Sequence, residues 1–244
     1  MNNHASGFSI IDVLSYLRNP HYTTPERRSL LSNAKYMLWS YIMCAIGILI
    51  AGCVILTIDY SIVTYLHIDS IYQQIRSTNT GVREAFGSYA FVVVVFVVPI
   101  LEELIFRLPL DLRRGSIALG VTLLFFRFVN GGLLVADFSK FFYWLGVALS
   151  IFLFAVVYIL LPKGFLSDIQ TKYFKYWYYF IVLAFGLVHI SNIKHIEFNY
   201  ILFYPLFVMP QIIMSIFISN IRMKRGFVWG IALHALINGI SFIL

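Results

Sequence analysis

Long apolar stretches separated by short polar ones dominate this chain. A helix that crosses a bilayer needs about 20 mostly apolar residues, and seven stretches meet or approach that length. They are residues 36–58, 89–110, 116–136, 141–161, 176–193, 198–219 and 227–244. An eighth stretch, 8–17, is too short to span, but its apolar residues recur at helical spacing, which is typical of an interfacial helix. The pattern predicts an all-α, polytopic membrane protein with about seven transmembrane helices around a polar cavity.

Charged residues are scarce and unevenly placed. They make up 12% of the chain, about half the share typical of soluble domains. Twelve of the 18 lysines and arginines fall in the N-terminal tail and in the loops after the second, fourth and sixth stretches. Because cytoplasmic loops carry excess positive charge, a multi-pass cell-membrane protein with a cytoplasmic N-terminus is expected. The same loops account for the net charge of +7, so no nucleic-acid partner is expected.

One long polar interruption, 59–88, suggests how the chain is organised. It separates the first span from a remainder that holds the unusual polar residues. We therefore expect a cytoplasmic tail at 1–35 with the interfacial helix, a first span and loop at 36–88, and a core at 89–244. Part of the loop is expected to form a short surface helix.

Two adjacent glutamates, Glu102 and Glu103, end the apolar run of the second stretch, and Arg107 follows four residues after Glu103. A charge inside a membrane segment costs roughly 2.5–3.5 kcal/mol on insertion scales, so two together indicate function. Residues four apart share a helix face, which predicts a Glu103–Arg107 pair. Glu102 lies about 100° away and is free to face a cavity as a general base. Alternatively, the span ends near Ile100 and all three residues lie in the headgroup region.

Two further motifs place histidines in apolar stretches. Phe185 and His189 are four residues apart, as are His234 and Asn238, so each pair shares a helix face. The ring of Phe185 is expected to lie against the imidazole of His189. The alternatives are a hydrogen-bonded core histidine at position 189 and interhelical hydrogen bonds from His234 and Asn238.

Other polar and proline residues also lie in predicted spans. Arg127 and Asn130 lie in the third predicted span and need polar partners there. A carboxylate of the first motif is one candidate. Pro205 and Pro210 are predicted to bend the sixth span.

The ordered patterns EExxxR, FxxxH and HxxxN resemble those of the CPBP family of intramembrane proteases. This family, also called Abi, includes the type II CAAX prenyl endopeptidases and bacteriocin-processing or immunity proteins. The resemblance covers roughly residues 89–244. It implies that Glu102 is the base that activates the attacking water, with His189 beside it. It also implies that His234 and Asn238 stabilise the oxyanion.

The resemblance implies that Glu103 and Arg107 have supporting roles, because they organise the first motif. The four-residue spacing gives Phe185 a supporting role beside His189. It implies an intramembrane endopeptidase whose partners are membrane lipid and a peptide or membrane-protein substrate, in peptide pheromone or bacteriocin maturation or in self-immunity. The alternative function is a catalytically silent scaffold that binds and regulates a membrane-protein partner.

The expected chemistry uses no cofactor. In an older view of the family, a metal takes part, and the alternative is therefore zinc bound by Glu102, His189 and His234. A set of two histidines and one glutamate suits zinc, but no HExxH spacing supports this alternative.

Overall fold

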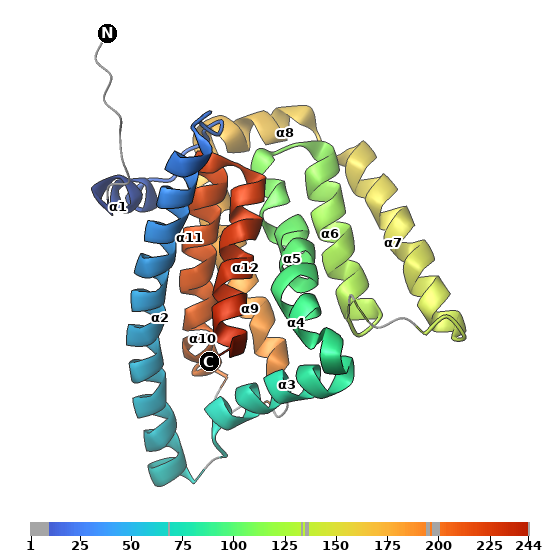
Figure 1. The fold of residues 1–244 in the computed structure, drawn as a ribbon. Coiled ribbons are helices and arrows are strands. Elements are labelled where there is room, and N and C mark those ends of the chain that lie inside the picture. The colour runs from blue at the N-terminus through green and yellow to red at the C-terminus, as the bar shows by residue number, and fades with distance from the viewer. Residues whose placement is uncertain are drawn as a thin grey trace.

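The protein is a bundle of helices that pack side by side and alternate in direction (Figure 1). The structure, a computed structural model, describes residues 10–67, 69–132, 134, 137–193, 196 and 201–243. Its regular elements in these residues are helices, without a strand. The all-α prediction is confirmed.

The regular elements follow one another with short connections. In order they are α1 (Ile10–Arg18), α2 (Leu30–Leu66), α3 (Ile71–Phe86), η1 (Gly87–Tyr89), α4 (Ala90–Val92), η2 (Val93–Val97), α5 (Val98–Phe106), η3 (Leu108–Asp111), α6 (Arg114–Val129), α7 (Phe141–Leu160), α8 (Lys163–Asp168), η4 (Ile169–Tyr173), α9 (Phe174–Val188), η5 (His189–Asn192), α10 (Tyr204–Phe207), α11 (Met209–Arg225) and α12 (Phe227–Ile243). Elements η2 and η4 are π-helical, and η1, η3 and η5 are 3₁₀ turns.

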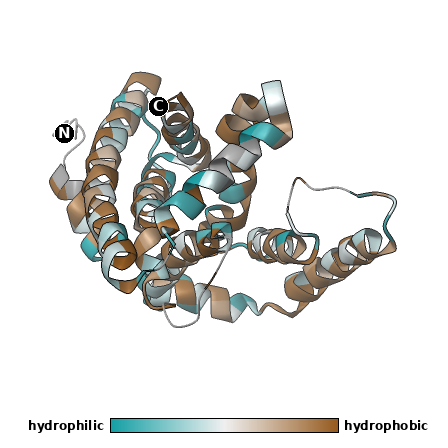
Figure 2. Cartoon of the chain, turned by 90° about the horizontal axis from the view of Figure 1, so that it is seen from below, coloured by the Kyte–Doolittle hydropathy of each residue, from teal (hydrophilic) through white to brown (hydrophobic). Residues whose placement is uncertain are grey.

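Four helices in the described part of the chain are long and apolar enough to cross a membrane. They are Leu30–Leu66, Arg83–Asp111, Phe141–Leu160 and Lys163–Asn192, and Phe227–Ile243 is apolar but shorter. Helices α6 and α11, of 16 and 17 residues, run alongside them (Figure 1). Viewed from below, the peripheral helices are predominantly hydrophobic (Figure 2). These features support a helical membrane protein, and the count of seven crossings stays a prediction.

Helix α2 is longer than the predicted span at 36–58. Its 37 residues extend about 55 Å at 1.5 Å per residue, beyond a hydrocarbon core of about 30 Å. Ser29 caps the start by accepting a hydrogen bond from the Ser32 amide. Near the other end, buried Asp59 accepts hydrogen bonds from the Ser70 hydroxyl at 2.6 Å and the Tyr72 amide at 3.1 Å. Asp59 therefore fixes the corner before α3, the expected surface helix.

Pro99 explains the irregular turn before α5. A proline lacks the amide that would bond the carbonyl four residues earlier, and its ring clashes with that carbonyl. The helix widens over Val93–Val97 into a π-helical turn but remains helical from Arg83 to Asp111. This length lets Glu102 lie well inside the bundle rather than at its edge.

Two other boundaries differ from the expected ones. Helix α6 ends at Val129 rather than at 136, because Gly131 and Gly132 adopt positive φ angles of 72° and 156°; residues 133, 135 and 136 lie outside the described part. The predicted bend of the sixth span is confirmed as a break at Val208, between α10 and α11. Helix α11 continues to Arg225, six residues past the expected end. Residues 198–200 are not described.

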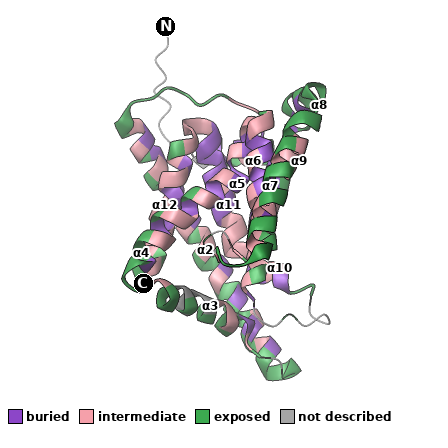
Figure 3. Ribbon diagram, turned by 90° about the vertical axis from the view of Figure 1, so that its right-hand side faces the viewer, coloured by how far each residue is buried: buried purple, intermediate pink, exposed green. Residues whose placement is uncertain are grey.

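The centre of the bundle is formed by α11, which packs against α2, α9 and α12. Close approach depends on missing side chains: a Cβ on Gly186 would meet Ile212 Cγ1 at 2.2 Å, and one on Gly120 would meet the Ile105 carbonyl oxygen at 2.7 Å. In contrast, α7 packs mainly against α6 and leaves most of its surface exposed (Figure 3). The bundle thus has a packed centre and a projecting α6–α7 hairpin.

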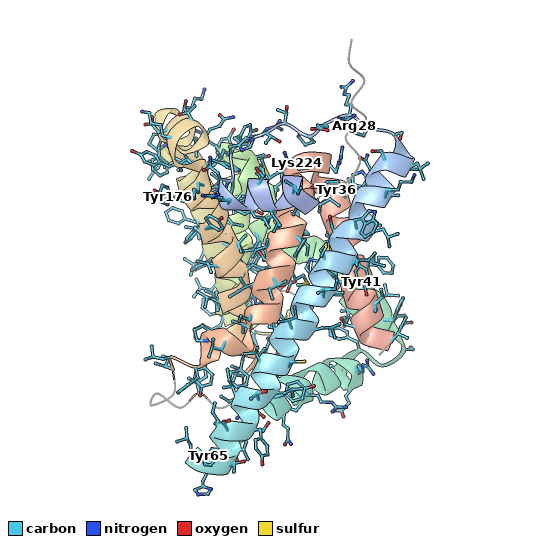
Figure 4. All side chains as sticks on the ribbon, turned by 90° about the vertical axis from the view of Figure 1, so that its left-hand side faces the viewer. Arg28, Tyr36, Tyr41, Tyr65, Tyr176 and Lys224 are labelled. Atoms are coloured by element: carbon cyan, nitrogen blue, oxygen red, sulfur yellow. The ribbon has the colours of Figure 1, made fainter. Side chains whose placement is uncertain are left out.

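The N-terminal segment lies across one end of the bundle. Helix α1 corresponds to the expected interfacial helix, whose residues 8 and 9 are not described. After it, Thr23 donates to the Met223 carbonyl and the Glu26 amide to the Lys224 carbonyl. Figure 4 shows Arg28 and Lys224 at this end and Tyr65 at the other. Two of the basic segments that sequence assigns to the cytoplasm therefore lie together.

Candidate active site

Side chains from three helical segments converge in the packed half of the bundle. Helix α5 supplies Glu102 and Glu103, the α9–η5 segment supplies His189, and α12 supplies His234. The carboxylates and imidazoles are within 4 Å of one another in several pairs. All three sequence motifs therefore contribute to one cluster.

Glu103 is held on two sides and is fully buried. Its Oε1 lies 3.4 Å from Arg107 Nη1, and both side chains are 0% exposed. The same oxygen lies 2.9 Å from His234 Nδ1. The predicted pair between Glu103 and Arg107 is confirmed, and the structure adds His234 as a second partner.

Glu102 points to a different set of neighbours, as its position on the helix predicts. Its Oε1 is 3.8 Å from His189 Nε2 and its Oε2 is 3.4 Å from His234 Nε2. Its side chain is 11% exposed and that of His189 is 13% exposed, whereas Glu103 is sealed. Glu102 is therefore the carboxylate with an approach from outside the cluster.

The hydrogen bonds of the two histidines fix which ring nitrogens face Glu102. His189 Nδ1 lies 2.7 Å from the Phe185 carbonyl oxygen, and a carbonyl only accepts, so Nδ1 carries the hydrogen. His234 Nδ1 donates to Glu103 for the same reason. In the neutral rings, both Nε2 atoms then present lone pairs towards Glu102. Three acceptors meeting at one point suit a shared proton or a water molecule that donates to two of them.

Phe185 is the aromatic centre of the cluster. Its ring lies 4.8 Å from the His189 ring, as predicted, and 5.9 Å from the His234 ring. The guanidinium of Arg107 lies over the same ring, 3.9 Å from its centroid, a cation–π contact. No hydrogen-bond partner for the Arg107 guanidinium nitrogens occurs among the described residues. The charge of Glu103 and the face of Phe185 therefore hold this arginine.

Asn238 lies one turn beyond His234 and binds elsewhere. Its amide nitrogen donates to the Val94 carbonyl oxygen at 3.1 Å. Val94 belongs to the π-helical turn that Pro99 imposes, where the regular bonding of carbonyls is disturbed. Asn238 therefore anchors the irregular turn to α12, and its predicted role at the oxyanion would use its second N–H.

Two residues of the surroundings are not foreseen from the sequence. Buried Arg222 donates from Nε to the Arg107 carbonyl oxygen at 3.0 Å, placing a cation at the C-terminal end of α5, where the helix dipole favours it. Gly230 lies one turn before His234, and a Cβ there would contact Glu103 Oε2 at 3.4 Å. In the sequence, Arg222 is counted only among the positive charges of a loop. Its position four residues before Gly226 does not predict a hydrogen bond to the Arg107 carbonyl.

The predicted carboxylate partner for Arg127 and Asn130 is wrong. Arg127 donates to the Ser191 hydroxyl at 3.5 Å, on the rim near His189. The Asn130 amide lies against Gly146 of α7, where an added Cβ would meet it at 2.7 Å. Asn130 is the C-cap of α6, and Arg127 lies in its last turn, where its side chain reaches Ser191 of η5 rather than the carboxylates of α5.

The zinc alternative concerns Glu102, His189 and His234. A zinc ion needs nitrogen and oxygen ligands arranged at about 2.0–2.2 Å around one centre. Within the described residues, no group of three or more His, Cys, Asp or Glu side chains is placed to hold a metal ion. Glu102, His189 and His234 are therefore not placed, as they are arranged, to hold zinc.

No family model, curated protein or solved structure matches the chain at a significant level. The chemistry of the cluster therefore rests on its own geometry.

Proposed function

We propose that this chain is an intramembrane endopeptidase of the CPBP (Abi) kind, which hydrolyses a peptide or membrane-protein substrate at or within the membrane. Maturation of a peptide pheromone or bacteriocin, or self-immunity, is the proposed role. The observation that carries the proposal is the position of Glu102, an accessible carboxylate between two imidazole Nε2 atoms in an apolar bundle. A charged group at such a place is a functional site by default.

The proposed mechanism begins with a water molecule bound to Glu102. The carboxylate takes one proton while the water oxygen forms a bond to the scissile carbonyl carbon, giving a tetrahedral oxyanion. The shared proton of the cluster, now on His234 Nε2, and the second N–H of Asn238 donate to this oxyanion. Glu103 stabilises the imidazolium through Nδ1, at 2.9 Å. Glu102 then returns its proton to the leaving amine as the C–N bond breaks.

The proposed orientation has seven crossings, with the N-terminus in the cytoplasm of a multi-pass cell-membrane protein. The contacts of Thr23 and Glu26 with the end of α11 support a common side for these basic segments. Reporter fusions after Leu110 and after Arg225 should report cytoplasm, and fusions near Lys194 and at Leu244 should report the exterior. A cytoplasmic signal at Leu244 would contradict the count of seven.

The test of the chemistry is hydrolysis by the purified chain in lipid nanodiscs. A library of hydrophobic peptides is incubated in ¹⁸O-labelled water, and new C-termini carrying ¹⁸O are detected by mass spectrometry. Glu102→Gln, which keeps the shape and removes the base, should lower the rate at least about 100-fold. Glu84→Gln, on an exposed position of α3, should leave it unchanged. Undiminished hydrolysis in Glu102→Gln would overturn the proposal.

The same experiment separates the alternatives. A silent scaffold would release no labelled C-termini and would keep its partner binding in Glu102→Gln. A zinc enzyme would lose activity on treatment with a chelator such as 1,10-phenanthroline, whereas the proposed metal-free enzyme keeps it.

A further inference from the structure

A surface cavity of about 450 Å³ lies where the start of α6, the end of α7 and α8 meet. It is separate from the glutamate–histidine cluster and shares no residue with it. Its lining includes three basic residues, Arg113, Arg114 and Lys163. Among the described residues, no acidic side chain belongs to the lining, so the cavity is suited to an anion.

The basic residues of the cavity are poorly neutralised by the protein itself. Arg113 approaches Asp111 at only 3.9 Å, and its side chain is 83% exposed. The Nε of Arg114 is buried and has no hydrogen-bond partner among the described residues. Lys163 makes no ion pair to a described residue, and Asp168, five residues further along the chain, pairs with Lys172 at 2.9 Å. Three cations are therefore available to an external ligand.

Hydrogen-bond donors and acceptors complete the cavity. Ser167 and Gln170 contribute polar side chains, and Tyr158 contributes a ring with a hydroxyl group. Helix α6 begins here, and its N-cap, Arg113, makes no side-chain capping bond. Asp111, just before it, accepts hydrogen bonds from the Arg113 amide and the Ser116 hydroxyl, both at 2.9 Å, which leaves the other amides of the first turn for a ligand. Amide hydrogens at the start of a helix favour a phosphate oxygen, in addition to the basic side chains.

The flank of the cavity is apolar and faces outward. Helix α7 leads up to it, and its large side chains Phe152, Ile159 and Leu160 are exposed by 67%, 69% and 70%. Figure 3 shows most of α7 exposed. A ligand that places its charge in the cavity can thus lay hydrocarbon along α7. Free phosphate has no hydrocarbon that could lie along α7.

We propose that the cavity binds the phosphate headgroup of an anionic phospholipid, with the acyl chains lying along α7. Basic pockets between membrane helices near the interface are suited to such headgroups. The bound lipid links the α6–α7 hairpin to α8, which continues through η4 and α9 to η5, where His189 lies. The projecting hairpin is then fixed to the packed half by a lipid in addition to its own contacts. This proposal does not depend on the proposed peptidase activity.

The test compares the chain in phosphatidylcholine nanodiscs with and without added phosphatidylglycerol. Native mass spectrometry counts retained phosphatidylglycerol, and thermal unfolding measures its stabilising effect. The variant Arg113→Gln/Lys163→Gln removes two exposed cations of the cavity, so it keeps the fold. Its affinity for phosphatidylglycerol should fall about tenfold or more.

The matched control is Arg27→Gln/Lys175→Gln, which removes two basic residues outside the cavity lining. It should keep the phosphatidylglycerol-dependent rise in melting temperature. Equal loss in both double variants would overturn the site, because general surface charge would explain the binding. An equal rise with inorganic phosphate in pure phosphatidylcholine would overturn the lipid as the source of the phosphate.

Discussion

Glu102 and Glu103 are neighbours in sequence but occupy two different environments. Glu103 is sealed between Arg107 and His234, with both members of its ion pair 0% exposed. Glu102 retains 11% exposure and faces ring nitrogens that offer it no hydrogen in their neutral form. The charge of Glu103 is therefore paired with that of Arg107, whereas Glu102 is surrounded by hydrogen-bond acceptors. A rotation of about 100° along one helix is enough to separate the two environments.

The contrast between the two glutamates suggests how one short motif could serve both stability and the proposed chemistry. Around Glu103, the opposite charges of Glu103 and Arg107 hold each other's side chains in place. The Glu102 side needs that network, because Glu103 orients the His234 ring through Nδ1 and so directs Nε2 towards Glu102. In the proposed enzyme, positioning and reactivity are therefore divided between adjacent residues.

Breaking the sealed pair should have the strongest effect on stability. Glu103→Ala or Arg107→Ala leaves a fully buried charge without its partner, at roughly 3–5 kcal/mol. Each should lower the melting temperature in detergent markedly. Glu102→Ala should spare stability or raise it, because an unpaired buried carboxylate is costly and function can retain such strain.

The control for this prediction is Glu84→Ala, which removes an exposed carboxylate from α3 and should change stability by less than about 0.5 kcal/mol. Melting temperatures of all four variants are measured together. Equal destabilisation by Glu102→Ala and Glu103→Ala would show that the two environments are not distinct.

The sequence predicted those contacts of the cluster that depend only on the spacing of residues along one helix. Glu103 of α5 and Arg107, its C-cap four residues later, pair as expected, and so do the rings of Phe185 and His189. The apolar stretches also predicted the helices, because each must satisfy its backbone hydrogen bonds internally in a membrane.

Contacts between distant helices could not be read from spacing. Asn238 shares a face with His234, yet it bonds the Val94 carbonyl, which is offered by a π-helical turn that Pro99 creates. Arg222 finds its carbonyl partner only because α11 continues to Arg225. Such partners depend on helix ends and irregular turns, which hydrophobic pattern does not determine.

A second, more moderate effect should follow from widening the contact between α9 and α11. A Cβ on Gly186 would meet Ile212 Cγ1 at 2.2 Å and its Cα at 3.4 Å, so Gly186→Ala must shift either the Ile212 side chain or one of the two helices. Overpacking of this kind costs about 1–3 kcal/mol. His189 follows Gly186 by less than one turn, so its distance from Glu102 should change and hydrolysis should slow.

The same substitution in open space provides the control. Gly52 on α2 has no atom within 4 Å of an added Cβ, so Gly52→Ala should be neutral or slightly stabilising through helix propensity. Both variants are measured by thermal unfolding and by ¹⁸O release. A neutral Gly186→Ala would mean that the packed half of the bundle tolerates movement, and that the sealed environment of Glu103 does not depend on tight helix contacts.

The weakest effect on stability is expected at Asn238, which lies at the edge between the two environments. Asn238→Ala removes one hydrogen bond to the Val94 carbonyl, a loss of about 0.5–1.5 kcal/mol. If its second N–H serves the oxyanion, hydrolysis should nevertheless fall about 100-fold, as for other lost oxyanion donors. The measurement is the turnover rate beside the melting temperature. If turnover falls only in proportion to the amount of folded protein, Asn238 has a structural role alone. His234 would then be the residue of α12 that donates to the oxyanion.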